Sequence, residues 1–199
     1  MSRRFRLLKP AFKAHYDIIS DDDAEQRQFY VDIKVKPFSK SVPGLTLYAG
    51  SDNSDNAPIL GASYKPAFSE TIKVAFGDPG QTSHVEWEEL EKTKLSRFEY
   101  KWSTYMPSKD TSDDEDRLTD LLWKRTSSEG VDGVQPSSWS PRNWKLTGDD
   151  GVVLAVFTSD KGIGKAGTLE IRADKGADWD IKVLMTLVCI YHRASQGGG

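Results

Sequence analysis

Residues 179–194 read WDIKVLMTLVCIYHRA, and this stretch decides the fold because it is the one long helix that the sequence predicts. Asp178 before it is a typical N-cap residue, and Asp180 places a negative charge in the first turn. Between positions 183 and 191 only Thr186 is polar, so the helix is apolar on every side. Such a helix is either buried in a core or spans a membrane. The apolar run is about half the ~20 residues that a bilayer requires, which favours burial.

The helix must therefore be enclosed by other elements of the chain. We expect its residues Leu184, Leu187, Val188 and Ile190 to be almost completely buried. Cys189 lies between two of them, and we expect it to pack as a small hydrophobic side chain rather than to act as a nucleophile.

Most of the remaining chain alternates between apolar and polar residues, as half-buried antiparallel strands do. The stretch QFYVDIKVK at residues 28–36 shows the pattern clearly. In residues 97–103, RFEYKWS, the alternation directs Phe98, Tyr100 and Trp102 to one face. We expect further strands over residues 5–8, 45–49, 59–64, 71–76, 84–88, 121–124, 143–146, 152–157 and 169–173.

The spacing of these strands suggests a sandwich or a barrel. VVLAVF, within residues 152–157, is apolar on both faces, and a strand of this kind must be covered on each side. A simple sandwich covers only one face of each sheet, and the apolar helix supplies the second cover. One local alternative stays open, because Leu118, Leu121 and Leu122 also fit a short amphipathic helix.

Composition excludes several classes of protein. The chain has 199 residues, with 27 Lys and Arg against 30 Asp and Glu, and the net charge of -3 argues against a dedicated nucleic-acid binder. The one cysteine excludes an intramolecular disulfide framework and a cysteine-rich zinc site.

No secretory leader is recognisable in residues 1–13. We therefore expect a monomer in the cytoplasm, with a membrane surface or the nucleus as further locations.

Two motifs suggest a cofactor or a metal, and each has a simpler interpretation. GIGKAG at residues 162–167 matches the dinucleotide-binding pattern, but TLEIRA follows it and alternates like a strand. We therefore expect a glycine-rich hairpin there and no cofactor. His84, Glu86 and Glu88 share one face of a predicted strand, where a solvated outer face is a simpler interpretation than a metal site. No catalytic motif is recognisable, and we expect a protein that is not an enzyme.

The N-terminus carries a cluster of basic residues with no acid among the first thirteen positions: Arg3, Arg4, Arg6, Lys9 and Lys13. Such a cluster attracts an anionic membrane surface by up to about 1 kcal/mol per residue. An ordinary solvated chain end is the alternative interpretation. Acidic or proline-directed contexts suggest loop phosphorylation sites at Ser20, Ser112 and Ser140.

The second half of the chain contains five stretches that resemble a known family. They are FEYKW at 98–102, RNWKL at 142–146, GVVLAVF at 151–157, GTLEI at 167–171 and the helix at 181–191. Together they resemble the tubby C-terminal-like superfamily, which includes tubby proteins, phospholipid scramblases and the plant LURP-one-related proteins. The likeness is greatest to uncharacterised fungal members, and it extends over the first half of the chain only by the rhythm of the strands.

The resemblance implies a mainly β fold, a closed antiparallel barrel of about 12 strands around the central hydrophobic C-terminal helix. Residues 1–196 would form this single domain, and residues 197–199 a flexible glycine tail. Tubby proteins bind phosphoinositides through basic residues on the barrel exterior, and none of those positions is transferred to this chain. The single cysteine, inside the helix, departs from the cysteine clusters of the scramblases and counts against lipid scrambling.

Two classes of partner follow from these features. The first is the headgroup of an anionic phospholipid, such as a phosphoinositide, bound by the basic N-terminal cluster. The second is another protein, for which the barrel would be an interaction module. An enzyme ranks third, and neither a nucleic-acid partner nor a membrane-spanning segment is expected.

Overall fold

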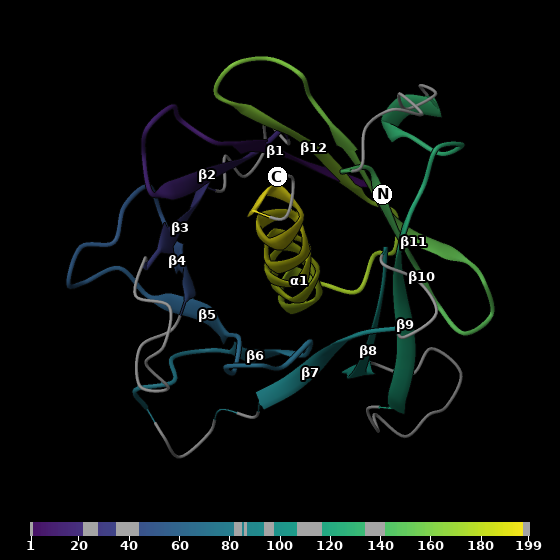
Figure 1. Cartoon of the computed structure of the whole chain (residues 1–199), viewed down its shortest axis with the longest axis horizontal. Coiled ribbons are helices and arrows are strands. Elements are labelled where there is room, and N and C mark those ends of the chain that lie inside the picture. Colours follow the sequence, from purple (N-terminus) through teal and green to yellow (C-terminus); the bar gives the residue numbers. More distant parts are fainter. Residues whose placement is uncertain are drawn as a thin grey trace.

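The computed structural model describes residues 2–21, 28–34, 44–81, 85, 87–93, 98–106, 117–133 and 142–196. Over these residues twelve antiparallel strands form a closed barrel, in which each strand pairs with its neighbours in the sequence and β12 pairs back with β1. One helix, α1, runs through the middle of the barrel (Figure 1). The predicted fold class is confirmed.

The strands follow one another along the chain with one short 3-10 turn, η1, between β9 and β10. They are β1 (Arg3–Leu8), β2 (His15–Ser20), β3 (Gln28–Ile33), β4 (Leu45–Ala49), β5 (Ile59–Tyr64), β6 (Ile72–Phe76), β7 (Trp87–Lys92), β8 (Glu99–Met106), β9 (Arg117–Arg125), η1 (Val131–Gly133), β10 (Trp144–Thr147), β11 (Val153–Ser159) and β12 (Lys165–Ile171). Full closure leaves the sheet without an exposed edge that could pair with another chain.

The helix α1 (Ala177–Gln196) extends two residues further at each end than the sequence predicts. The N–H of Asp180 donates to the carbonyl of Gly176 at 3.4 Å, so Asp178 lies inside the first turn and is not the N-cap. Gly176 has a φ of 88°, a backbone conformation that glycine adopts without strain. The helix therefore begins directly after a sharp turn. No helix in the described part of the chain is long and apolar enough to cross a membrane.

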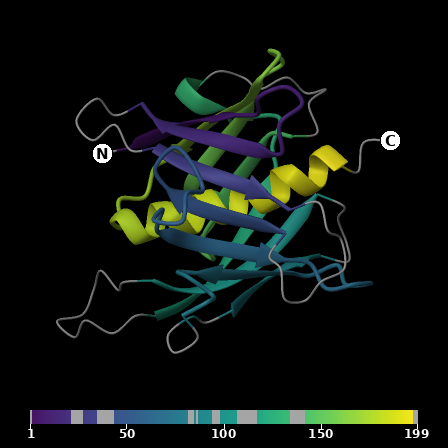
Figure 2. The ribbon, with the colours of Figure 1, turned by 90° about the vertical axis from the view of Figure 1, so that its left-hand side faces the viewer.

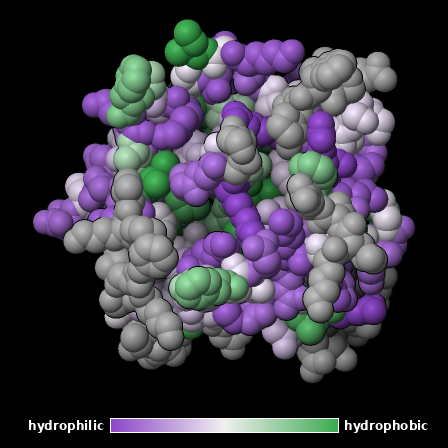
Figure 3. All heavy atoms as spheres, in the orientation of Figure 1, coloured by the Kyte–Doolittle hydropathy of each residue, from purple (hydrophilic) through white to green (hydrophobic). Residues whose placement is uncertain are grey.

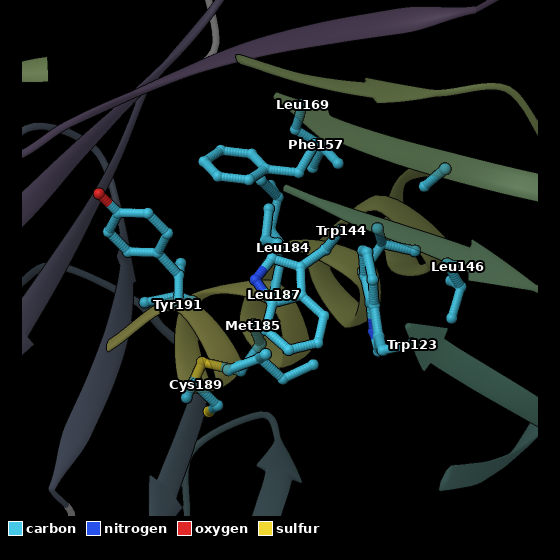
Figure 4. Packing of buried hydrophobic residues seen from close by; sticks show 14 of the residues in the cluster. Trp123, Trp144, Leu146, Phe157, Leu169, Leu184, Met185, Leu187, Cys189 and Tyr191 are labelled. Atoms are coloured by element: carbon cyan, nitrogen blue, oxygen red, sulfur yellow. The ribbon is translucent and has the colours of Figure 1, made fainter. Parts of the chain in front are cut away.

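The apolar side chains of α1 fill the barrel. Leu184, Leu187, Val188 and Ile190 are each no more than 2% exposed, which confirms the prediction of a buried helix. Large side chains from the inner faces of the strands surround them, among them Trp123, Trp144, Leu146, Phe157 and Leu169 (Figure 4).

Thr186, the one polar residue in the apolar run, has its hydrogen bonds satisfied inside the core. Its hydroxyl accepts a hydrogen bond from Nε1 of Trp123 at 3.1 Å and donates to the carbonyl of Lys182 at 2.9 Å. Leaving a buried polar group without a partner would cost about 1–3 kcal/mol. The bond to Trp123 therefore favours the rotation of α1 that turns Thr186 toward β9.

The strand with two apolar faces is covered on both sides, as predicted. Ala155 and Phe157 belong to the core around α1, and the Phe157 ring lies 5.4 Å from that of Tyr191. Val156, on the opposite face, is completely buried, and η1 contacts β11 and β12. The backbone N–H of Val131 donates to the hydroxyl of Thr158 and ties this outer segment down.

Several strands differ from the sequence prediction, and β2 and β8 differ in ways that bear on the predicted side-chain positions. The strand β2 was not predicted, because its inward-facing positions are Tyr16, Ile18 and the polar Ser20. Ser20 is the buried last residue of this strand rather than a loop residue, so the phosphorylation hypothesis was wrong about its setting. Phe98 precedes β8 and is 41% exposed, with the Arg125 guanidinium over its ring, so it does not point inward.

The structure decides between strand and helix at residues 118–122, but it does not describe the other two predicted phosphorylation sites or the glycine tail. Residues 118–122 belong to β9, which selects the strand over the amphipathic helix. Ser112, Ser140 and the tail at 197–199 lie outside the described residues.

Candidate functional site

The barrel has two distinct ends, defined by the direction of α1. Arg3, at the start of β1, bonds to Asp180 near the start of α1, whereas Tyr16, beside the end of β1, bonds to His192 near its end. The strands alternate in direction, so turns that follow odd-numbered strands lie where α1 ends. We call this end the C-rim, and we call the other end, formed by the turns after even-numbered strands and the first turn of α1, the N-rim (Figure 2).

Charge is divided between the two rims in the described residues. The N-rim carries mostly acids: Asp21, Asp52, Asp55, Asp78, Asp149, Asp150, Asp174, Asp178 and Asp180, against Arg172 and Lys175. The C-rim carries mostly bases: Lys9, Lys13, Lys34, Lys65, Arg142, Lys161 and Arg193, against Glu70 and Asp160. Glu129 and Asp132, between β9 and β10, lie on the barrel wall instead, where they contact Arg172 and Arg4. Among the described residues, therefore, one end of the barrel is acidic and the other basic, although the net charge of the chain is small.

The structure divides the predicted basic cluster among different environments. Arg3 lies at the N-rim with its side chain 13% exposed, and its Nε is 2.8 Å from the carboxylate of the buried Asp180. A second ion pair joins it to Asp174. Burial alone would lower the pKa of Arg3, but the hydrogen bonds and charges of the two aspartates outweigh it and raise that pKa. The same contact lowers the pKa of Asp174. Arg3 therefore holds β1 to the start of α1.

Arg4 and Arg6 point away from the core and are paired on the barrel wall. Arg4 forms an ion pair with Asp132 of η1 and lies 4.0 Å from Glu170 of β12. Arg6 forms an ion pair with Asp21 at 2.5 Å. Because neighbouring carboxylates neutralise both guanidinium groups, Arg4 and Arg6 are poorly placed to bind an anion.

Lys9 and Lys13 are the members of the cluster that reach the C-rim. The Lys9 ammonium lies 5.1 Å from the centre of the Tyr16 ring and donates to the backbone carbonyl of Lys13. Burial lowers the pKa of Lys9. Lys13 is exposed in the turn between β1 and β2.

A polar network covers the end of α1 beneath these lysines. The hydroxyl of Tyr16 and Nδ1 of His192 are hydrogen-bonded at 3.0 Å. Burial, and secondarily the charge of Lys9, lower the pKa of His192, so the neutral imidazole is favoured. Gln196 lies against the other ring nitrogen at 2.8 Å. Both ring nitrogens of this histidine therefore have polar partners at the C-terminal end of α1.

The C-rim also carries the most exposed large apolar side chains among the described residues. Phe12 and Phe68 are completely exposed, and Ile163 is 95% exposed. They lie at the tips of the turns after β1, β5 and β11. In Figure 3, which views this end, separate hydrophobic groups stand out among hydrophilic ones. These residues were not predicted, because nothing in the local sequence distinguishes an exposed turn phenylalanine from a buried one.

The strand predicted at residues 84–88 differs in its bounds and in the direction of Glu88. The described strand is β7 (Trp87–Lys92), and Glu88 points into the barrel near the N-rim rather than to a solvated face. Its carboxylate accepts hydrogen bonds from Nε1 of Trp102 at 2.5 Å and from the hydroxyl of Thr104 at 2.8 Å. Lys182 of α1 lies 3.7 Å from the same carboxylate.

The other members of the suggested metal set are not part of this arrangement. His84 and Glu86 lie outside the described residues. Among the residues that the structure describes, no three His, Cys, Asp or Glu side chains are grouped as metal ligands would be.

The glycine-rich motif forms a hairpin, as predicted, although β12 already begins at Lys165. A Cβ atom at Gly167 would lie 2.3 Å from the carbonyl oxygen of Thr158. The close approach of β11 therefore requires glycine at this position. A strand, not a helix, follows the motif, so the helix N-terminus that would hold a pyrophosphate is not formed here.

Cys189 is expected to be unreactive in the folded protein. It is 2% exposed, and burial raises the pKa of its thiol to about 12, so almost no thiolate is present near neutral pH. With Ellman's reagent at pH 8, the native protein should release no thionitrobenzoate while the denatured chain releases one equivalent. Rapid reaction of the native protein would show that α1 leaves the barrel.

Comparison with known proteins does not assign the chain to a family. No protein-family model matches it, and no curated protein matches it either. The resemblance to the tubby C-terminal-like superfamily stays a prediction.

Proposed function

We propose that this chain is a non-enzymatic protein whose C-rim binds the headgroups of anionic phospholipids at a membrane surface. The observation that carries the proposal is the separation of charge between the two rims. A basic surface near an anionic leaflet gains about 1 kcal/mol for each lysine or arginine. An acidic opposite end is repelled by the same leaflet, so the protein is oriented as well as attracted.

The lysines of the turns are better suited to this role than the arginines of β1. Lys13, Lys65 and Lys161 are exposed and lie in three different turns of the C-rim. Arg3, Arg4 and Arg6 are held by carboxylates on the barrel wall and at the N-rim. A phosphoinositide carries more charge than phosphatidylserine, and we propose it as the preferred lipid.

The test is sedimentation with liposomes of phosphatidylcholine alone, with added phosphatidylserine, and with added phosphoinositide. Wild type should bind the anionic liposomes only, more tightly with phosphoinositide, and less at high salt, because surface attraction fades within about 8 Å at physiological ionic strength. The double variant Lys13→Glu/Lys65→Glu should bind at least about tenfold more weakly. The variant Lys101→Glu/Arg117→Glu, at exposed positions of β8 and β9 outside the C-rim turns, changes the net charge equally and should bind like wild type.

Two results would contradict the proposal. One is equal loss of binding in both double variants, which would mean that net charge alone governs attraction. The other is no sedimentation of wild type with any anionic liposome. In that case the protein-interaction module is favoured, and a specific protein that stays bound at moderate salt is the expected partner.

A further inference from the structure

The same four residues, Lys-Pro-Ala-Phe, occur in two turns of the C-rim. They are residues 9–12, between β1 and β2, and residues 65–68, between β5 and β6. The two hairpins are separated around the barrel by the β3–β4 hairpin. The repeated sequence therefore presents two identical turns on one end of the molecule, some distance apart.

The two turns also share their backbone geometry. The N–H of Lys13 donates to the carbonyl of Pro10 at 3.3 Å, and the N–H of Ser69 donates to that of Pro66 at 3.2 Å. The third residue of each turn is the phenylalanine, with a φ of 62° at Phe12 and 61° at Phe68. This is the pattern of a type II turn, in which the third position normally holds glycine or asparagine.

A third turn of the C-rim uses the expected residue. Between β11 and β12, the N–H of Lys165 donates to the carbonyl of Gly162 at 3.1 Å, and Gly164 stands at the third position with a φ of 77°. This turn lies beside that of Phe12, because the N–H of Lys9 donates to the carbonyl of Gly164 at 2.9 Å. In two of these three turns, therefore, a phenylalanine occupies the third position, where glycine would adopt the positive φ without strain.

Neither phenylalanine gains anything from the folded chain in return. Both side chains are completely exposed, and neither belongs to the hydrophobic core. Residues held in sparsely populated backbone conformations cluster at functional sites. A single exposed apolar side chain is common on a protein surface. Here, however, two phenylalanines occupy identical turns of positive φ on the same rim.

We infer that Phe12 and Phe68 insert into an anionic lipid bilayer, with Ile163 as a third, smaller anchor. The inference rests on the proposed function and deepens it. Exposed lysines flank each tip, namely Lys13, Lys65 and Lys161, and they would meet the phosphate groups as the rings enter the acyl boundary. A lipid bilayer is fluid and can admit separate side chains at several points of the rim. A protein–protein interface, in contrast, usually has one continuous apolar core.

Insertion also sets the orientation of the molecule. The tips share the rim at which α1 ends, so α1 would point toward the membrane and the acidic N-rim away from it. Burying one phenylalanine contributes about tenfold in affinity or more, and this part of the binding does not weaken with salt. The lysines supply the salt-sensitive part.

The first experiment removes the rings without disturbing the turns. Phe12→Asn/Phe68→Asn keeps the left-handed backbone, which asparagine tolerates, so its melting temperature should equal or exceed that of wild type. Its binding to phosphatidylserine and phosphoinositide liposomes should fall about a hundredfold. Leu118→Asn/Val152→Asn, at two apolar residues that are each 55% exposed and lie away from the C-rim, is the matched control and should bind like wild type.

The second experiment detects insertion directly. Cys189 is buried, so a thiol-reactive NBD dye will label a cysteine introduced by Phe12→Cys or Phe68→Cys in the native protein. With anionic liposomes the emission at both positions should rise and shift to the blue. The dye at Asn53→Cys, in an exposed turn of the N-rim, should not change.

The outcomes separate this inference from the proposed function. Wild type that sediments with anionic liposomes, together with unshifted dyes and full binding of Phe12→Asn/Phe68→Asn, would overturn insertion and leave headgroup binding intact. Failure of wild type to sediment at all would overturn the proposed function, and insertion with it. Blue-shifted dyes at 12 and 68 with a selective loss in the asparagine variant would support both.

Discussion

Leu187→Asp is expected to leave no folded protein. Leu187 is 1% exposed in the middle of α1, and every side of the helix at this level faces the inner wall of the barrel. A carboxylate there would be buried without a partner, and the penalty is several kcal/mol. The free energy of unfolding of a domain is about 5–15 kcal/mol. The cost of burying this one carboxylate is therefore a large part of the total stability.

Expression, solubility and circular dichroism test this prediction. Leu187→Asp should accumulate in the insoluble fraction or lack a cooperative thermal transition. Leu187→Met is the control, because a swap of similar volume costs less than about 1.5 kcal/mol. A soluble Leu187→Asp protein with a cooperative transition would show that α1 is not enclosed by the strands.

Arg3→Ala is expected to destabilise the protein by about 3 kcal/mol, because it removes the guanidinium that lies 2.8 Å from the buried carboxylate of Asp180. Arg6→Ala, on the same strand, removes an exposed pair with Asp21 and should change stability by less than about 1 kcal/mol. Denaturation midpoints in urea, with unchanged slopes, would measure both effects.

A double variant separates the buried pair from its surroundings. Arg3→Leu/Asp180→Leu removes both charges together and should recover most of the stability that Arg3→Ala loses. Equal destabilisation by Arg3→Ala and Arg6→Ala would contradict the structural role of Arg3. The same reasoning makes Arg3 unsuitable for testing membrane binding, because its substitution would lower stability and lipid affinity at once.

Several features of the candidate site follow from sequence and several do not. The basic residues at positions 3–13 are visible in the sequence, and two of them, Lys9 and Lys13, do belong to the C-rim. The partners of Arg3 and Arg4 are not visible, because Asp180, Asp132 and Glu170 lie more than a hundred residues away. Net charge in a segment indicates attraction only when the folded chain leaves that charge uncompensated.

Local patterns in the sequence predicted most of the strands and the buried helix, whereas the tertiary structure decided which turns meet on one rim. Alternation in the strands and the apolar run at 183–191 are local patterns, and each directs side chains inward wherever the segment lies. The convergence of the turns at 9–13, 65–69 and 160–165 on one rim depends instead on strand order and direction. Those are set by pairing between distant segments, which no local pattern encodes. Phe12 and Phe68 therefore come to lie on the same rim only when the barrel has closed.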